Sequence, residues 1–384
     1  MRVAFYAPMK WPGHAVPSGD RLLARMFVAA LERAGHTVVV ASRLRTWEGA
    51  GDAARQSRLA AVGARTGERL LRRYRDRTEL APDLWFTYHL YHRAPDWLGP
   101  VVSAGLSIPY VVAEASVARK QAKGPWGDGY EAALTAVRRA DAVICVNPGD
   151  VPGVALAREG RSPPLQLAPF FDVGAFVASA DEPQAQDVLR GLDLPRGSPR
   201  LVAVAMMRQR DKLDSYRILA AALGRLRHGS WHLVVVGDGE ARAEVEQGFA
   251  PFGAQRVRFV GSQPAPVIAA LLGQCDLFVW PAINEAIGMA MLEAQACGAP
   301  VVAGRSPGVA AIVSDRETGL LVPLGDDAAF AAAVDELLAE PSRRAAMAQR
   351  AREQARARHD LAAAAAVLDA VLSDVRAARG LAAA

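Results

Sequence analysis

The sequence predicts an α/β protein with two domains, each built around a parallel β-sheet. The chain opens with an apolar strand at residues 3–7, an amphipathic helix at 21–34 and a second strand at 37–41, which together form a βαβ unit. A similar buried strand starts at residues 201–205, after a stretch at 170–199 whose Pro and Gly content is typical of a linker. With 384 residues, of which 51% are hydrophobic, the chain can bury two ordinary cores.

Composition narrows the class of protein further. The formal net charge is +5 and comes almost wholly from arginine, since the lysines are only Lys10, Lys120, Lys123 and Lys212. A basic balance of this kind suits phosphorylated ligands or an anionic membrane surface. The scattered cysteines predict neither a disulfide framework nor a zinc site. The apolar runs are too short to span a bilayer, and residues 1–6 start a strand rather than a signal peptide, so we expect a cytoplasmic protein.

In the first domain, residues that could contact a ligand follow several of the predicted strands. Gly19 lies in the loop after the first strand, His89 follows a strand at 82–88, and Glu114 follows a strand at 108–113. The carboxyl ends of parallel strands meet at one edge of a sheet, so these residues should open on the same crevice. His89 and Glu114 are therefore candidates for ligand contact, with a structural hydrogen bond as the alternative reading of each.

The stretch at residues 280–302 reads as strand end, loop, helix, turn and strand. If the helix begins near Gly288, its free N–H groups and the positive end of its dipole can bind a phosphate. Glu293 lies roughly 7–8 Å further along at ~1.5 Å per residue, which is about the separation of a diphosphate from its ribose. A lone carboxylate among apolar neighbours is costly to bury, so Glu293 should face a polar ligand. Glu285, in the loop, would face the group beyond the diphosphate, and the layout fits a nucleotide-sugar.

Glu285, seven further residues and Glu293, followed by Gly-Ala-Pro-Val-Val-Ala at 298–303, resemble the E-x7-E signature of the retaining glycosyltransferases of family 4. Residues 201 to about 347 also follow that family's order of elements. The resemblance implies a retaining, metal-independent hexosyltransferase that moves a sugar from a nucleotide-sugar donor to a glycan, lipid-linked or small-molecule acceptor. Retention is usually explained by front-face attack in which the donor's own phosphate takes the acceptor proton, so that no side-chain base is needed.

The resemblance also implies an architecture, the GT-B fold. In this fold two Rossmann-like parallel-sheet domains face each other across a cleft, and the last helix crosses back to the first domain. We therefore expect an acceptor-binding domain at residues 1–190, a domain that binds the nucleotide-sugar donor at 200–358, and a C-terminal helix within 359–384 that packs on the first domain.

Site residues follow from the same resemblance. In the second domain it places Ile287, Gly288, Met289 and Glu293 on the nucleotide and its diphosphate. It makes Glu285 the carboxylate that contacts the transferred sugar, where positive charge develops in the transition state.

Two cations are expected on the diphosphate leaving group. The family supplies an arginine and a lysine after the first strand of the second domain, carried here by Arg208 and Lys212. The spacing is shorter than common, so Arg210 could stand in for Arg208. Gly19 resembles the glycine that the family places against the diphosphate in the first domain. A histidine commonly follows the strand at 108–113 in that family, but this chain has Glu114 there.

Absent motifs exclude several alternatives. The chain has no D-x-D pair for chelating a metal–diphosphate complex and no Gly-x4-Gly-Lys-Ser/Thr loop, so we expect neither a metal nor a cofactor, and no NTPase activity. Arginine without a recognition motif does not favour nucleic acid. Two other functions stay open on the same fold: a nucleotide-sugar 2-epimerase, and a catalytically silent subunit that binds a nucleotide-sugar.

Residues 53–78 are dense in arginine and have helical apolar spacing. A basic amphipathic helix can lie on an anionic bilayer, which would make the protein peripheral at the inner face of the membrane. The alternative is a solvated helix face beside the core.

Overall fold

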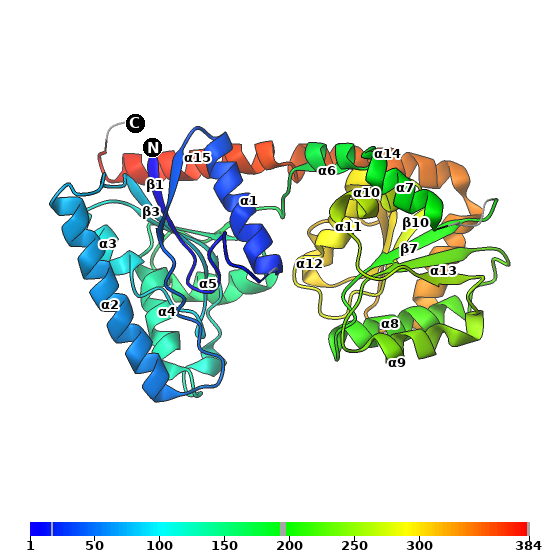
Figure 1. Cartoon of the computed structure of the whole chain (residues 1–384), viewed down its shortest axis with the longest axis horizontal. Helices are drawn as coiled ribbons and strands as arrows, with labels where there is room; N and C mark the ends of the chain where they lie inside the picture. The colour runs from blue at the N-terminus through cyan, green and yellow to red at the C-terminus, as the bar shows by residue number, and fades with distance from the viewer. Residues whose placement is uncertain (17, 193–196, 382–384) are drawn as a thin grey trace. The chain divides into compact units, whose positions relative to one another are not determined.

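The computed structural model describes residues 1–16, 18–192 and 197–381, and the chain divides into two compact units (Figure 1). The N-terminal unit consists of Met1–Leu167 together with Leu361–Ala384, and the C-terminal unit is Ala168–Asp360. Each unit has a six-stranded sheet in which every paired strand is parallel, so the predicted α/β class with two parallel sheets is confirmed.

The sheet of the N-terminal unit has the order β2-β1-β3-β4-β5-β6. Its strands are β1 (Arg2–Tyr6), β2 (Thr37–Ser42), β3 (Leu84–Leu90), β4 (Tyr110–Ala115), β5 (Ala142–Cys145) and β6 (Leu165–Gln166). The helices of this unit are α1 (Gly19–Arg33), α2 (Ala53–Arg75), α3 (Gly99–Leu106), α4 (Gly127–Arg139), α5 (Val151–Ala157) and α15 (Leu361–Ala378). Aromatic side chains fill the core between the sheet and α1, where Phe5, Phe27 and Phe86 are fully buried.

The last helix, α15, packs in the N-terminal unit against α1 (Figure 1). Its buried residues Leu361, Leu368 and Leu372 form an apolar stripe at helical spacing. His36, at the turn after α1, lies 3.3 Å from the carboxylate of Asp369 and joins the two elements. The helix is therefore part of this unit although most of the chain separates it in sequence from β6.

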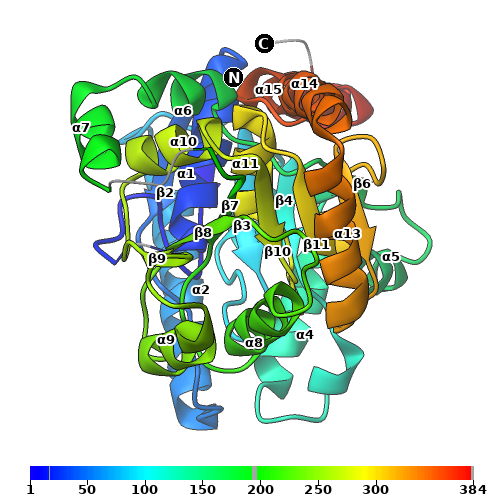
Figure 2. The ribbon, with the colours of Figure 1, turned by 90° about the vertical axis from the view of Figure 1, so that its right-hand side faces the viewer.

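The sheet of the C-terminal unit has the order β12-β11-β10-β7-β8-β9. Its strands are β7 (Arg200–Val204), β8 (His232–Val236), β9 (Val257–Phe259), β10 (Leu277–Trp280), β11 (Val301–Gly304) and β12 (Gly319–Val322). The helices of this unit are α6 (Val173–Ser179), α7 (Pro183–Gly191), α8 (Asp211–Leu223), α9 (Arg242–Phe249), α10 (Ala265–Gly273), α11 (Met289–Cys297), α12 (Pro307–Ala310), α13 (Asp327–Ala339) and α14 (Pro341–Arg358). Figure 2 shows α8 and α9 on one side of the sheet and α10 and α11 on the other.

The chain crosses between the two units at residues 167–168, earlier than the sequence predicted. Residues 168–190, which were expected in the first domain, form α6 and α7 and pack on α10 and α11 of the C-terminal unit. Ala185 and Leu189 of α7 are buried. This apolar packing places residues 168–190 in the C-terminal unit, although the Pro and Gly content of the segment is typical of a linker. Residues 193–196 of the predicted linker lie outside the described residues. The return crossing lies at residues 360–361, so 359–360 also belong to the C-terminal unit.

No helix among the described residues is long and apolar enough to cross a membrane.

Candidate active site

The helix α11 begins where the sequence predicted, directly after Gly288. Gly288 is its N-cap residue and has φ +80°, a left-handed conformation that favours glycine. A Cβ at this position would also lie 2.8 Å from the terminal methyl group of Met291. No side chain caps this end of the helix. The first N–H groups of α11 are therefore left for a ligand or for solvent.

Glu293 lies in the second turn of α11, between the buried residues Leu292 and Ala294. Its side chain is partly buried, and no described residue forms a hydrogen bond or an ion pair with it. Burial raises the pKa of Glu293 to about 7. A carboxylate without a partner in such a position is unfavourable for the free protein, and a ligand that donates hydrogen bonds would remove the penalty.

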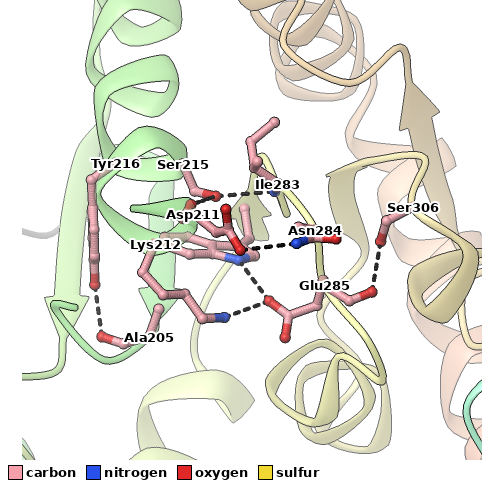
Figure 3. A network of polar contacts seen from close by, with 10 residues as sticks. Ala205, Asp211, Lys212, Ser215, Tyr216, Ile283, Asn284, Glu285 and Ser306 are labelled. Atoms are coloured by element: carbon pink, nitrogen blue, oxygen red, sulfur yellow. Dashed lines mark hydrogen bonds and ion pairs between the residues drawn. The ribbon is translucent and has the colours of Figure 1, made fainter. Parts of the chain in front are cut away.

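Glu285 lies in the loop between β10 and α11 and forms an ion pair with Lys212, from the first turn of α8 (Figure 3). The lysine Nζ is 2.5 Å from Oε2 of Glu285, and the indole Nε1 of Trp280 donates to the same oxygen over 3.3 Å. Lys212 also lies 5.4 Å from the centre of the Trp280 ring, within the range of a cation–π contact. The structure thus brings together two predicted site residues that are far apart in sequence.

The loop that carries Glu285 is held by polar contacts with α8 (Figure 3). Ser215 accepts a hydrogen bond from the backbone N–H of Ile283 over 3.0 Å, and Asp211 accepts one from the side-chain amide of Asn284 over 3.0 Å. Asn284 has φ +55°, which this amide bond helps to maintain. The loop is therefore fixed to α8 at Ile283 and Asn284, directly before Glu285.

A second set of contacts holds the loop from the side of β11. Ser306, 1% exposed, donates to the backbone carbonyl of Glu285 over 3.1 Å. A Cβ on Gly308 would lie 2.1 Å from the carbonyl oxygen of Ala286, so only glycine permits this approach. The sequence alone assigns no role to residues 306–308, because their partner lies about 20 residues earlier in the chain and only the fold brings the two segments together.

The two arginines predicted near the diphosphate lie in the segment between β7 and α8. Arg208 and Arg210 are both exposed, and neither is paired with Glu285. Arg210 is the N-cap residue of α8 and has φ +66°. The segment is fixed by Met207, whose backbone N–H donates to the carbonyl oxygen of Asp238 over 2.9 Å. Lys212 is therefore the predicted cation that the structure places against Glu285.

In the N-terminal unit, Gly19 is the first residue of α1, and Ser18 caps the helix by accepting from the N–H of Arg21. Space is open around the position that a Cβ of Gly19 would occupy. The backbone at this helix end is therefore accessible to a ligand, and its contact with a diphosphate stays a prediction.

His89 and Glu114 both lie inside strands, whereas the sequence placed them after the strand ends. His89 belongs to β3 and Glu114 to β4. The carboxylate of Glu114 accepts from the backbone N–H groups of Val146 and Asn147, the latter over 3.1 Å. Burial raises the pKa of Glu114. The structural hydrogen bond considered for Glu114 is therefore present, while the carboxylate of Asp20 lies 3.1 Å from Nδ1 of His89.

Among the described residues, no group of three or more His, Cys, Asp or Glu side chains is placed to hold a metal ion. Lys212 is the side-chain cation that forms an ion pair with Glu285.

Known proteins resemble this chain in sequence. Residues 198–340, which include both predicted site carboxylates, match the profile of a family described as "Glycosyl transferases group 1". The chain is 31% identical over 230 residues to the lipopolysaccharide core biosynthesis glycosyltransferase LpsE of Rhizobium meliloti, covering 58% of this chain and 62% of LpsE. It is 35% identical over 204 residues to a D-inositol 3-phosphate glycosyltransferase of Salinispora tropica, covering 50% of this chain and 42% of that protein. The chain thus spans less than two thirds of the length of these curated relatives.

Solved structures resemble almost the whole chain. Anabaena HepE in complex with UDP superposes with a TM-score of 0.72 at 19% identity, covering 97% of this chain and 100% of HepE. A glycosyltransferase from Rickettsia africae gives a TM-score of 0.74 at 15% identity, covering 97% of this chain and 98% of that one. With the two parallel sheets, these likenesses establish the predicted two-domain GT-B fold.

Proposed function

We propose that this protein is a glycosyltransferase that moves a hexose from a nucleotide-sugar donor to an acceptor with retention of configuration and without a metal ion. The observation that carries the proposal is the pair of Lys212 and Glu285 beside the uncapped N-terminus of α11, with the unpartnered Glu293 further along the same helix. The match of residues 198–340 to a glycosyltransferase profile supports it.

The donor's parts are assigned to this region by charge and by spacing. The backbone N–H groups of Ile287, Gly288 and Met289 would bind the diphosphate at the N-terminus of α11. Glu293 would accept from the ribose hydroxyl groups. Glu285 would contact the sugar as positive charge develops at its anomeric carbon.

In this proposal Lys212 binds the diphosphate leaving group. Its ammonium group forms an ion pair with Glu285, which lies in the loop that leads into α11. A departing diphosphate gains negative charge as the sugar–oxygen bond breaks, so a cation that binds it more tightly at that stage lowers the barrier. Arg208 would add a second charge from the same segment.

A donor screen tests the proposal directly. We expect one of the UDP-, GDP- or ADP-sugars to raise the free energy of unfolding by ~2.7 kcal/mol at about 100 times its dissociation constant. Thermal-shift measurements with each nucleotide-sugar, and with the free sugar as the control, will detect the change. No stabilisation by any nucleotide-sugar or nucleoside diphosphate would contradict the proposal.

Incubation with the stabilising donor and no acceptor distinguishes the three functions that share this fold. Slow release of nucleoside diphosphate favours the transferase, formation of an epimeric nucleotide-sugar favours the 2-epimerase, and binding without turnover favours a silent subunit. The relatives reported above are named as glycosyltransferases, which supports the first outcome.

Contact with an anionic membrane is part of the proposal, and the structure restricts its form. The apolar side of α2 packs on α3 and is buried, whereas Arg65, Arg69 and Arg72 are exposed. A bilayer contact through this helix would therefore be electrostatic, with no apolar insertion.

We expect replacement of Arg65, Arg69 and Arg72 by Gln to abolish co-sedimentation with vesicles that contain anionic phosphatidylserine, since each basic residue near the surface contributes about 1 kcal/mol. The control variant replaces the exposed α14 residues Arg352, Arg356 and Arg358 by Gln, which changes the net charge equally. Equal loss of binding in both variants would show that α2 is not the contact.

A further inference from the structure

Three tryptophans in loops of the N-terminal unit each have an arginine stacked on the ring. The guanidinium Cζ atoms lie 4.4 Å from the ring centre for Arg43 on Trp11, 4.6 Å for Arg45 on Trp47 and 4.1 Å for Arg93 on Trp126. These residues lie in the segments that follow β1, β2, β3 and β4. All three pairs are therefore at the carboxyl edge of the sheet, which is the edge at which open α/β sheets bind ligands.

Two of these arginines have guanidinium groups that the protein leaves largely unused. No described residue accepts a hydrogen bond from the side chain of Arg93, and Arg45 donates through Nε to the backbone carbonyl of Met9 over 3.0 Å. No carboxylate of the described residues forms an ion pair with either side chain. Stacking on a tryptophan holds the planar group in place, so less conformational entropy is lost when an anion binds to it.

Tyr91 shows that Arg45 and Arg93 act at one place. Burial raises the pKa of Tyr91, whereas its hydrogen bond with Trp47 and the positive charges of Arg93 and Arg45 lower it. The loops that carry the two arginines are also joined directly, because the backbone N–H of Glu48 donates to the carbonyl oxygen of Arg93 over 2.8 Å. Both guanidinium groups therefore lie in reach of the same phenol ring.

The carboxylates of this region are already engaged by other groups. Glu48 is 1% exposed and accepts from the backbone N–H groups of residues 50 and 51, each over 2.7 Å, and from the indole of Trp126 over 3.0 Å. The carboxylate of Asp20 lies 3.1 Å from Nδ1 of His89. Neither carboxylate forms an ion pair with the stacked arginines, so the positive charge of this edge is left for a ligand.

An aromatic row lies beside the arginines. The rings of Tyr91 and His92 have centres 5.2 Å apart, those of His92 and Trp126 are 5.7 Å apart, and all three side chains belong to partly exposed residues. Such rings present an apolar body to a ligand together with a polar tip. A molecule with C–H groups on one side and an anionic substituent on the other, such as a charged sugar, matches this combination.

We propose that the carboxyl edge of the N-terminal sheet binds an acceptor sugar that carries a phosphate or carboxylate group, with Arg45 and Arg93 on that group. The guanidinium N–H groups match the oxygens of either anion, and each hydrogen bond is charge-assisted. An anion also relieves the repulsion between two positive charges that act on one site. This inference rests on the proposed function, in which the first domain binds the acceptor, and narrows the acceptor to anionic sugars.

Calorimetry with glucose 6-phosphate, glucuronate, glucose and inorganic phosphate tests the inference. We expect the wild type to bind one of the two anionic sugars at least about 10-fold more tightly than glucose or inorganic phosphate, and more weakly as the salt concentration rises. Arg45→Gln and Arg93→Gln should each weaken that binding by at least about 10-fold. Arg33→Gln is the control, because Arg33 is exposed in the last turn of α1, at the opposite edge of the sheet.

A preference for glucose 6-phosphate would assign a phosphorylated acceptor, and a preference for glucuronate a carboxylated one. Binding of neither anionic sugar, equal affinity for glucose or for inorganic phosphate, or an Arg45→Gln variant that binds as tightly as Arg33→Gln would overturn the inference. Arg45 is exposed, so its variant decides the outcome even if Arg93→Gln fails to fold. A wild-type protein that binds neither UDP nor GDP would instead overturn the proposed function, whereas nucleotide binding without anionic-sugar binding would overturn this inference alone.

Discussion

Glu285→Gln is expected to lower the turnover number by about 10²–10³-fold while nucleoside diphosphate affinity stays within about threefold of the wild type. The proposed contact of Glu285 is with the sugar, whose positive charge exists only in the transition state. Gln keeps the shape of the side chain and can still accept from Lys212, which lies 2.5 Å from the carboxylate. The loss should therefore appear in catalysis and not in folding or in product binding.

Initial rates with the donor and calorimetry with the nucleoside diphosphate measure the two quantities. The exposed Glu317 provides the control variant, Glu317→Gln, which removes the same charge from the same unit. Full activity of Glu285→Gln, or a loss of product affinity as large as the loss of rate, would show that Glu285 does not face the sugar.

The elements around this site could be predicted because their signals are local. Gly288 and Gly298 bound α11 in the structure at the places where the sequence required a start and a stop. The parallel sheets follow from βαβ order, and the strand-end rule directed attention to His89 and Glu114 before their contacts were known.

Other features depend on contacts between distant segments, which the sequence does not display. The domain boundary was misplaced because Pro and Gly content is a local signal, whereas burial of Leu189 against the second unit is not. The pairing of Asp20 with His89, and the support that Ser306 gives to the Glu285 loop, join residues far apart in the chain. The left-handed backbone of Glu114 has no signal in a non-glycine residue.

The second large effect is expected at Glu293. A carboxylate that accepts from two ribose hydroxyl groups forms charge-assisted hydrogen bonds, which Gln cannot reproduce. We expect Glu293→Gln to weaken nucleoside diphosphate binding by ~1.5–3 kcal/mol, or roughly 10–150-fold in the dissociation constant. Calorimetry with UDP and GDP measures the change, and Glu317→Gln is again the control. Unchanged affinity would place the ribose elsewhere.

The same substitution should make the free protein more stable in alkaline solution. Burial raises the pKa of Glu293 from an ordinary value of 4.5 to about 7, so the protonated form is favoured in the fold. Its contribution to stability is complete below pH 4.5 and is lost as the pH rises through about 7, because the ionised carboxylate then lies partly buried without a partner. Glu293→Gln should therefore melt at a higher temperature than the wild type at pH 8 and at a similar temperature at pH 4.5.

Ligand binding should show the opposite pH dependence at this residue. The ionised carboxylate accepts hydrogen bonds more strongly, so wild-type affinity for a nucleoside diphosphate should increase as the pH rises through about 7, where Glu293 loses its proton. The nucleotide's own phosphate titrates with a pKa of about 6, and its titration changes the affinity of wild type and variant equally. The difference between the two affinity profiles therefore reports the titration of Glu293. A ligand-binding carboxylate at this position would destabilise the free protein at the pH at which the ligand binds best, because binding requires its ionised form. A purely structural carboxylate would change stability and leave the two affinity profiles parallel.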